Sequence, residues 1–107
     1  MRNCDIKKDL LTRQKKIAQE ASVDGRRVMV LFPDAEWRSA ALPESENVWL
    51  RASTEEHSLK SLPIDTLILV AWDHPSWSQR GAQYATELLR TSRDPRILYL
   101  FWGGTNE

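Results

Sequence analysis

The residues best suited to acid–base chemistry are the neighbours Asp73 and His74. A histidine beside a carboxylate can act as a general base or bind a metal ion. Neighbouring side chains usually diverge, however, and a pair that directly follows an apolar run is typical of a turn with a capping role. We therefore predict that the chain has no catalytic residue. If it has one, Asp73 and His74 are the candidates. The other histidine, His57, has no ligand spacing such as H-E-x-x-H around it, so no metal site is predicted.

Motifs for nucleophilic and phosphate chemistry are absent from the sequence. It contains no G-x-S-x-G, S-x-x-K, G-x-x-x-x-G-K-[ST] or G-x-G-x-x-G pattern, and its four glycines make a phosphate-binding loop hard to build. Cys4 is the only cysteine, which excludes an internal disulfide and a cysteine-based metal site. We therefore expect no cofactor.

Large aromatic residues follow the predicted strands. In open parallel sheets, ligands bind beyond the carboxyl ends of the strands, and four of the five tryptophans map to that edge. Aromatic residues in loops beside polar groups are typical of protein contact surfaces. They could equally close the end of a small core, and the sequence leaves both interpretations open. The candidate protein-binding residues are Trp37, Trp72, Trp77 and Trp102.

The elements that must position these residues alternate between helix and strand. We predict a helix over 5–22, capped by Asp5 and stopped by Gly25, and a short helix from Asp34 to Leu42 that ends before Pro43. Ser76 and Gln79 fit a capping box for a further helix that runs to 93. The predicted strands are 28–32, 48–50, 66–72 and 97–102, with one or two helical turns in 54–62. This order predicts a small three-layer α/β domain, Rossmann-like, with a mostly parallel sheet of about four strands.

Basic residues gather near the start of the chain. Residues 1–30 hold eight Lys or Arg against four Asp or Glu, whereas residues 31–66 hold three against seven. The candidate nucleic-acid-binding residues are Lys7, Lys8, Lys15, Lys16, Arg26 and Arg27. The formal net charge of zero argues against this function, because binding to a phosphate backbone needs clustered positive charge. A solvated helix face explains the same pattern.

Length and composition restrict the class of protein. A chain of 107 residues, 41% of them hydrophobic, fits one domain over 1–107. No apolar stretch approaches the roughly 20 residues of a membrane span, and the basic N-terminus lacks the apolar region of a signal peptide. We therefore expect a cytoplasmic protein without membrane contact.

The order of segments resembles the first ATPase core domain of helicases and of phage terminase motors. Segment 27–33, an apolar strand ending in proline, resembles the strand that follows the phosphate-loop helix in that family. Segments 65–74 and 95–105 resemble the strand with the metal-binding Asp-Glu pair and the next strand, which often ends in Ser-Ala-Thr. The pair is replaced by Val70-Ala71 or Trp72-Asp73, the Ser-Ala-Thr turn is replaced by 101–103, and no phosphate loop precedes the first helix. The resemblance thus implies a remnant scaffold that does not hydrolyse ATP.

Three functions remain open on these observations. We favour a non-enzymatic protein-interaction module, similar in style to phage and mobile-element accessory proteins that bind host machinery. The alternatives are a nucleic-acid-binding accessory protein and a small metal- or phosphate-dependent enzyme that uses Asp73 and His74, with Asp34. Because aromatic edges also serve symmetric dimers, a homodimer is a further possibility.

Overall fold

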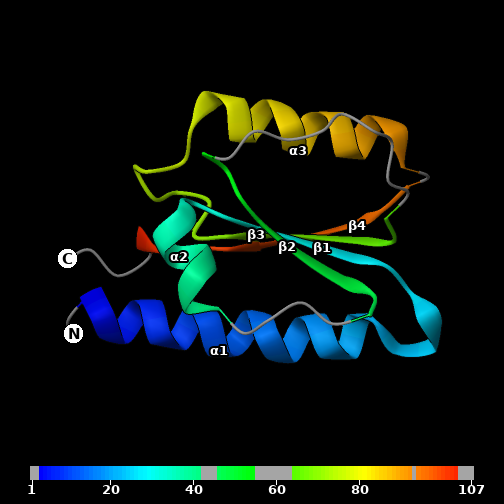
Figure 1. Ribbon diagram of the computed structural model, residues 1–107, viewed down its shortest axis with the longest axis horizontal. Coiled ribbons are helices and arrows are strands. Elements are labelled where there is room, and N and C mark those ends of the chain that lie inside the picture. The colour runs from blue at the N-terminus through cyan, green and yellow to red at the C-terminus, as the bar shows by residue number, and fades with distance from the viewer. Residues whose placement is uncertain (1–2, 42–45, 55–63, 93, 104–107) are drawn as a thin grey trace.

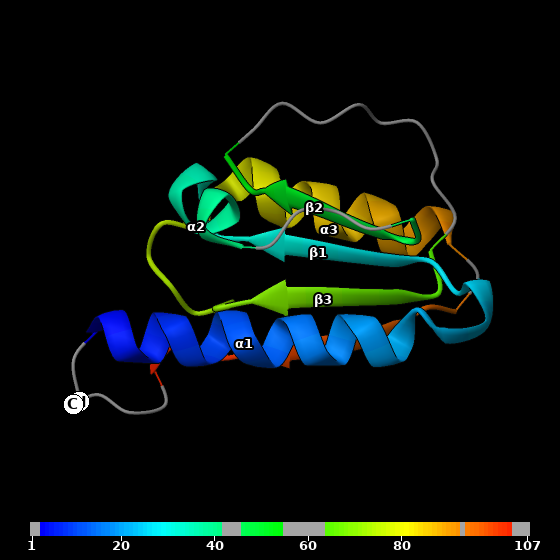
Figure 2. The same ribbon diagram turned by 60° about the horizontal axis from the view of Figure 1, so that its bottom comes forward.

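The computed structural model describes residues 3–41, 46–54, 64–92 and 94–103. Its sheet contains four parallel strands in the order β2-β1-β3-β4. Figure 2 shows the arrowheads of β2, β1 and β3 at the same end of the sheet. The prediction of an α/β fold with a parallel sheet of about four strands is therefore confirmed. The elements are α1 (Asn3–Ala21), a 3-10 turn (Val23–Gly25), β1 (Val28–Phe32), α2 (Ala35–Ala40), β2 (Val48–Ala52), β3 (Thr66–Val70), α3 (Gln79–Thr91) and β4 (Arg96–Leu100).

The sheet lies between two layers of helix, with α1 and α2 on one face and α3 on the other (Figure 1). The central strands β1 and β3 are buried along their whole length, as expected for strands covered on both faces. Because side chains alternate along a strand, even-numbered residues of β1, β3 and β4 face α1 and odd-numbered residues face α3. The α1-side core includes Val30, Ile68 and Leu100, and the α3-side core includes Leu31, Leu69 and Leu88.

The helix ends differ in part from the sequence prediction. Asp34 caps α2 as predicted, because its carboxylate accepts a hydrogen bond from the N–H of Trp37. The predicted cap of α1 is wrong, since the helix begins at Asn3 and Asp5 lies in its first turn. The predicted cap of α3 is also wrong. Its N-cap is Ser78, whose hydroxyl accepts from Gly81, whereas Ser76 bonds to His74.

The strand that precedes α3 is shorter than predicted. β3 ends at Val70, because Ala71 adopts a left-handed backbone conformation with φ of 49°. Trp72 and Asp73 therefore lie in the β3–α3 turn. The helical turns predicted over 54–62 and the position of Pro43 lie outside the described residues, as does His57. Within the described part of the chain, no helix is long and apolar enough to cross a membrane.

A buried serine joins three elements at the carboxyl end of β2. Ser53 is fully buried, and its hydroxyl donates to the carbonyl of Pro33 after β1 and accepts the N–H of Ser78 at 3.2 Å. In return, the Ser78 hydroxyl donates to the Ser53 carbonyl at 2.7 Å. Gly81 packs directly against Ser53, and a Cβ added there would meet the Ser53 Cβ at 2.2 Å. The start of α3 is therefore held to the ends of β1 and β2.

Candidate functional site

The carboxylate of Asp73 holds the turn that follows β4. Its Oδ1 accepts the N–H of Trp102 and its Oδ2 accepts the N–H of Gly103, both at 2.6 Å. A Cβ added at Gly103 would meet Oδ2 at 2.6 Å, so the turn and the carboxylate fit closely. Both oxygens thus already bind backbone amides, which suits a structural link between β3 and β4 better than a free catalytic base.

The imidazole of His74 is also occupied by local contacts. Its Nδ1 accepts the backbone N–H of Ser76 at 3.0 Å, and the Ser76 hydroxyl lies 2.8 Å from the same nitrogen. We infer that the proton of the neutral ring is on Nε2, because the backbone N–H can only donate. The nearby hydroxyl does not form a nucleophile–base pair of the usual kind, since the lone pair of Nδ1 is shared with the N–H of the same residue.

The structure does not bring the sequence-predicted chemistry together. No hydrogen bond joins Asp73 to His74, and each of them binds other groups. Asp34, the third candidate, accepts the amide at the start of α2. Among the described residues, no three His, Cys, Asp or Glu side chains form a group that could hold a metal ion. The candidate catalytic residues therefore all have structural hydrogen bonds.

The tryptophans predicted at one sheet edge divide between its two faces. On the α1 side, Trp37, His74 and Trp102 form a cluster of edge-to-face rings with centroids 5.0 to 5.7 Å apart. The Nζ of Lys7 lies 5.3 Å from the centre of the Trp37 ring. Trp37 is only 3% exposed, so it fills the core end rather than presenting a surface. For Trp37, the structure thus shows the core position that the sequence left open.

A second aromatic cluster lies on the α3 side. Trp72 meets Trp77 at a centroid distance of 4.8 Å and Tyr99 at 5.9 Å. Tyr99 stacks on Phe101 at 6.1 Å with an angle of 18° between the rings. The indole N–H of Trp77 donates to the Val70 carbonyl, which fixes the position of the Trp77 ring. We call these four side chains, Trp72, Trp77, Tyr99 and Phe101, the aromatic patch.

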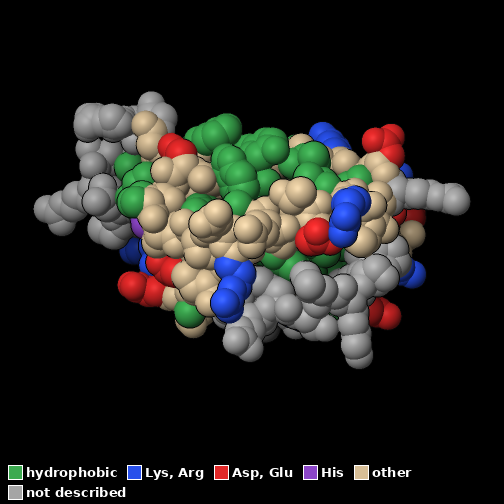
Figure 3. Space-filling model, turned by 90° about the horizontal axis from the view of Figure 1, so that it is seen from above, with side chains coloured by type: hydrophobic (Ala, Val, Ile, Leu, Met, Phe, Trp, Pro, Cys, Tyr) green, Lys and Arg blue, Asp and Glu red, His purple; other side chains and the backbone are tan. Residues whose placement is uncertain are grey.

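The outer half of the aromatic patch is open to solvent. Tyr99 is 45% exposed and Phe101 is 56% exposed. α3 packs mainly over the central strands β1 and β3, and β4 contributes only the partly buried Ile97 to that core. Seen from the α3 side, hydrophobic side chains gather along the upper edge of the molecule (Figure 3). Incomplete cover by a single helix therefore leaves Tyr99 in β4 and Phe101 directly after it uncovered.

Sequence reasoning did not select Tyr99 and Phe101. The sequence predicts 97–102 as a strand, and its continuous apolar run does not indicate which side is exposed. In the structure, Arg96 and Tyr99 of β4 are exposed and only Leu100 is fully buried, because β4 is an edge strand. Alternation of aromatic residues at 99 and 101 was the available signal, since these positions share one face.

The basic residues considered for nucleic-acid binding are spread along α1 and the start of β1. Lys7 lies over Trp37 and 3.8 Å from the carboxylate of Glu36. On an α-helix, Lys7 and Lys16 project about 180° apart. Arg26 and Arg27 lie beyond the other end of α1, at the start of β1. The two other candidate lysines, Lys8 and Lys15, are exposed on α1 and lie seven positions apart, on the same side of the helix.

Comparisons with known proteins do not add to this picture. No protein-family model matches the chain, and no curated protein or solved structure is significantly similar to it. The functional argument therefore rests on the geometry alone.

Proposed function

We propose that the chain is a non-enzymatic protein-interaction module that binds its partner through the aromatic patch and the adjoining edge of β4. The observation that carries this proposal is the exposed, stacked pair of Tyr99, in the edge strand β4, and Phe101, directly after it. Exposed aromatic side chains supply large contact areas at low entropic cost, and they are enriched where proteins bind one another.

The free edge of β4 supports binding of an extended partner segment. Among the described residues, β4 pairs only with β3, so its outer N–H and C=O groups have no strand neighbour there. β4 begins with the charged Arg96, but from Ile97 to Phe101 the chain has no charge, proline or glycine, which are the usual means of blocking edge pairing. A partner strand along β4 would gain backbone hydrogen bonds, while its side chains contact Tyr99 and Phe101.

The aromatic patch is also fixed in place before binding. The Trp77 indole is bound to the Val70 carbonyl, and the N–H of Trp72 donates to the Leu100 carbonyl. These bonds hold the inner rings against β3 and β4, and the inner rings support Tyr99. Preorganisation of this kind reduces the entropy lost on association.

Two alternatives lack a comparable observation. An enzyme that uses Asp73 and His74 would have to break the hydrogen bonds that both side chains already make. A nucleic-acid-binding surface would need the basic side chains on one face, whereas Lys7 and Lys16 project about 180° apart on α1. We further propose, from the sequence resemblance, a cytoplasmic accessory protein of the phage type on a scaffold that does not hydrolyse ATP.

The first test removes the exposed rings without touching the core. The double variant Tyr99→Ala/Phe101→Ala is compared with wild type in capture from a host-cell lysate, and retained proteins are identified and purified. Val23→Ala is the matched control, because Val23 is as exposed as Phe101, at 56%, but lies beyond α1. Trp77→Ala is less suitable, since Trp77 is partly buried and hydrogen-bonded.

We expect one purified partner to bind wild type and Val23→Ala equally, and to bind the double variant at least tenfold more weakly. Hydrogen exchange at β4 amides should slow in the complex. If sedimentation shows a dimer that the double variant loses, the partner is a second copy of this chain. Equal binding by the double variant, or capture of nucleic acid alone, would overturn the proposal.

A further inference from the structure

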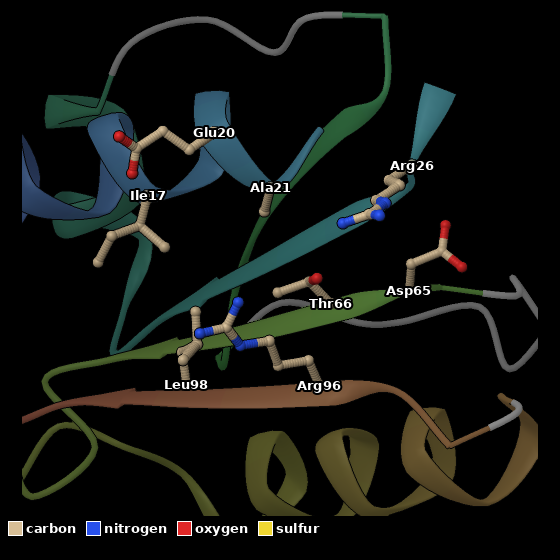
Figure 4. Close-up of a pocket in the computed structure, with 8 residues that line it drawn as sticks. All are labelled: Ile17, Glu20, Ala21, Arg26, Asp65, Thr66, Arg96 and Leu98. Atoms are coloured by element: carbon tan, nitrogen blue, oxygen red, sulfur yellow. The ribbon is translucent and has the colours of Figure 1, made fainter. Parts of the chain in front are cut away.

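A pocket of about 430 Å³ lies at the end of the sheet where the strands begin, opposite the end that carries the candidate tryptophans. Its walls come from the end of α1, from the segment before β1, and from the first residues of β3 and β4 (Figure 4). The volume is within the range of about 300 to 1,000 Å³ that is usual for small-molecule sites. None of the sequence candidates except Arg26 lies here.

Two arginine side chains converge on this pocket. In the close-up, the Arg26 guanidinium extends over the sheet from the segment before β1, and the Arg96 guanidinium reaches towards Leu98 on the same side (Figure 4). No hydrogen bond or ion pair joins either guanidinium to another described residue. Because β1, β3 and β4 are neighbours, the two arginines flank the first residue of β3. Two like charges therefore lie at one site, and neither forms an ion pair with a carboxylate among the described residues.

The residue between the arginines adds a hydroxyl group. Thr66 is 4% exposed and lines the pocket. Its hydroxyl makes no hydrogen bond to any described residue, although its backbone N–H donates to the Arg27 carbonyl at 3.1 Å. A hydroxyl that faces a pocket can donate a hydrogen bond to a ligand there.

The two acidic residues of the lining, Glu20 and Asp65, form no ion pair with the two arginines. The carboxylate of Asp65 turns away from the pocket, and its Oδ2 accepts the N–H of Arg27 at 2.8 Å (Figure 4). The side chain of Glu20 extends along α1, away from Arg26. The end of α1 opposes an anion less than a bare helix end would, because the carbonyls of Ala18 and Gln19 accept hydrogen bonds from Ser22.

We infer that this pocket binds the oxyanion group of a small organic ligand, a phosphate or a carboxylate. Arg26 and Arg96 donate to the oxyanion from two sides, and the hydroxyl of Thr66 donates from the floor. Planar guanidinium groups match the oxygen spacing of both anions and can bind them through two parallel hydrogen bonds. The apolar wall formed by Ile17, Ala21 and Leu98 contacts the carbon part of the ligand.

The test is an NMR titration of the isotope-labelled chain with four probes. Phenyl phosphate and benzoate each carry one of the two oxyanions on a phenyl ring. Inorganic phosphate lacks the apolar ring, and benzyl alcohol has the ring but no charge. The variants are Arg26→Gln, Arg96→Gln and Thr66→Val. Arg90→Gln is the control, because Arg90 is an exposed arginine on α3 that pairs with Glu87. Circular dichroism confirms that each variant is folded.

We expect phenyl phosphate or benzoate to shift the amides of Arg26, Thr66 and Arg96, and the tighter of the two identifies the ligand class. Inorganic phosphate should bind more weakly, and benzyl alcohol should not bind at these amides. Each arginine substitution should weaken affinity about tenfold to a hundredfold, the effect of losing a charged hydrogen bond. Lack of binding by both organic anions at millimolar concentration would overturn the inference, as would equal weakening by Arg90→Gln.

Discussion

Replacing Gly81 by alanine tests the contact between α3 and the end of β2. Gly81 lies in the first turn of α3 and is buried. A Cβ at this position would lie 2.2 Å from the Ser53 Cβ, 2.8 Å from its Cα and 3.0 Å from its carbonyl oxygen. Because two of these atoms belong to the backbone, no side-chain rotation relieves the overlap. α3 would have to move away from β2.

Two effects of opposite sign decide the result. Alanine is a better helix former than glycine, which alone would raise the free energy of unfolding by about 0.5–1 kcal/mol. Forcing an extra methyl group into a packed interface costs about 1–3 kcal/mol, occasionally more. Movement of α3 would also stretch the bonds between Ser53 and Ser78. We therefore expect the free energy of unfolding to fall by about 2 kcal/mol.

Urea unfolding followed by circular dichroism and tryptophan fluorescence measures this change. Gly25→Ala is the control, because Gly25 has φ of 77° and no atom within 4 Å of an added Cβ. It should cost about 1 kcal/mol from backbone strain alone. Ser53→Gly in the Gly81→Ala background removes the nearest clashing atom, so the two substitutions should show favourable coupling. Unchanged or increased stability of Gly81→Ala would show that the close approach to Ser53 is absent.

Two further predictions concern buried polar groups. Gln14 is 3% exposed and its Oε1 has no hydrogen-bond partner among the described residues, so Gln14→Met should raise the free energy of unfolding by about 1 kcal/mol. Gln19→Met, on the exposed side of α1, should change little, and a loss in Gln14→Met would contradict the reasoning. Burial raises the pKa of the Tyr84 phenol, and the charge of Arg51 opposes this shift. A raised folded-state pKa favours the protonated phenol, so its contribution is present below the unfolded pKa of about 10 and is lost as pH rises further. Tyr84→Phe should therefore lose less stability between about pH 9 and 11 than wild type does, and an equal loss would refute the assignment.

The central strands could be predicted because their side chains leave little choice. Residues 28–32 and 66–70 are continuous apolar runs, and only cover on both faces removes them from water. The alternation with helices then favours parallel pairing. Local signals were weaker at the helix starts. Ser76 and Ser78 are both suitable caps by sequence, and Ser78 was selected by its bonds to the distant Ser53.

The arrangement of the aromatic residues could be predicted only in part. Their place at the carboxyl ends of the strands follows from the chain order of strands and tryptophans. Their division between two faces depends on side-chain alternation near the strand ends, which changed when β3 ended at Val70. The exposure of Tyr99 and Phe101 depends on β4 being an edge strand, and a sequence does not state the order of strands in a sheet.

Sequence alone determined the class of fold, the central strands and the lack of known catalytic motifs, because these depend on hydrophobic pattern and on neighbouring residues. Tertiary structure decided which surfaces are available for binding. The pocket donors Arg26, Thr66 and Arg96 meet only because the β2-β1-β3-β4 order places β1, β3 and β4 side by side. The patch on β4 is open only because α3 covers the middle of the sheet. Contacts between residues so far apart in sequence depend on strand order and helix packing, which no local pattern encodes.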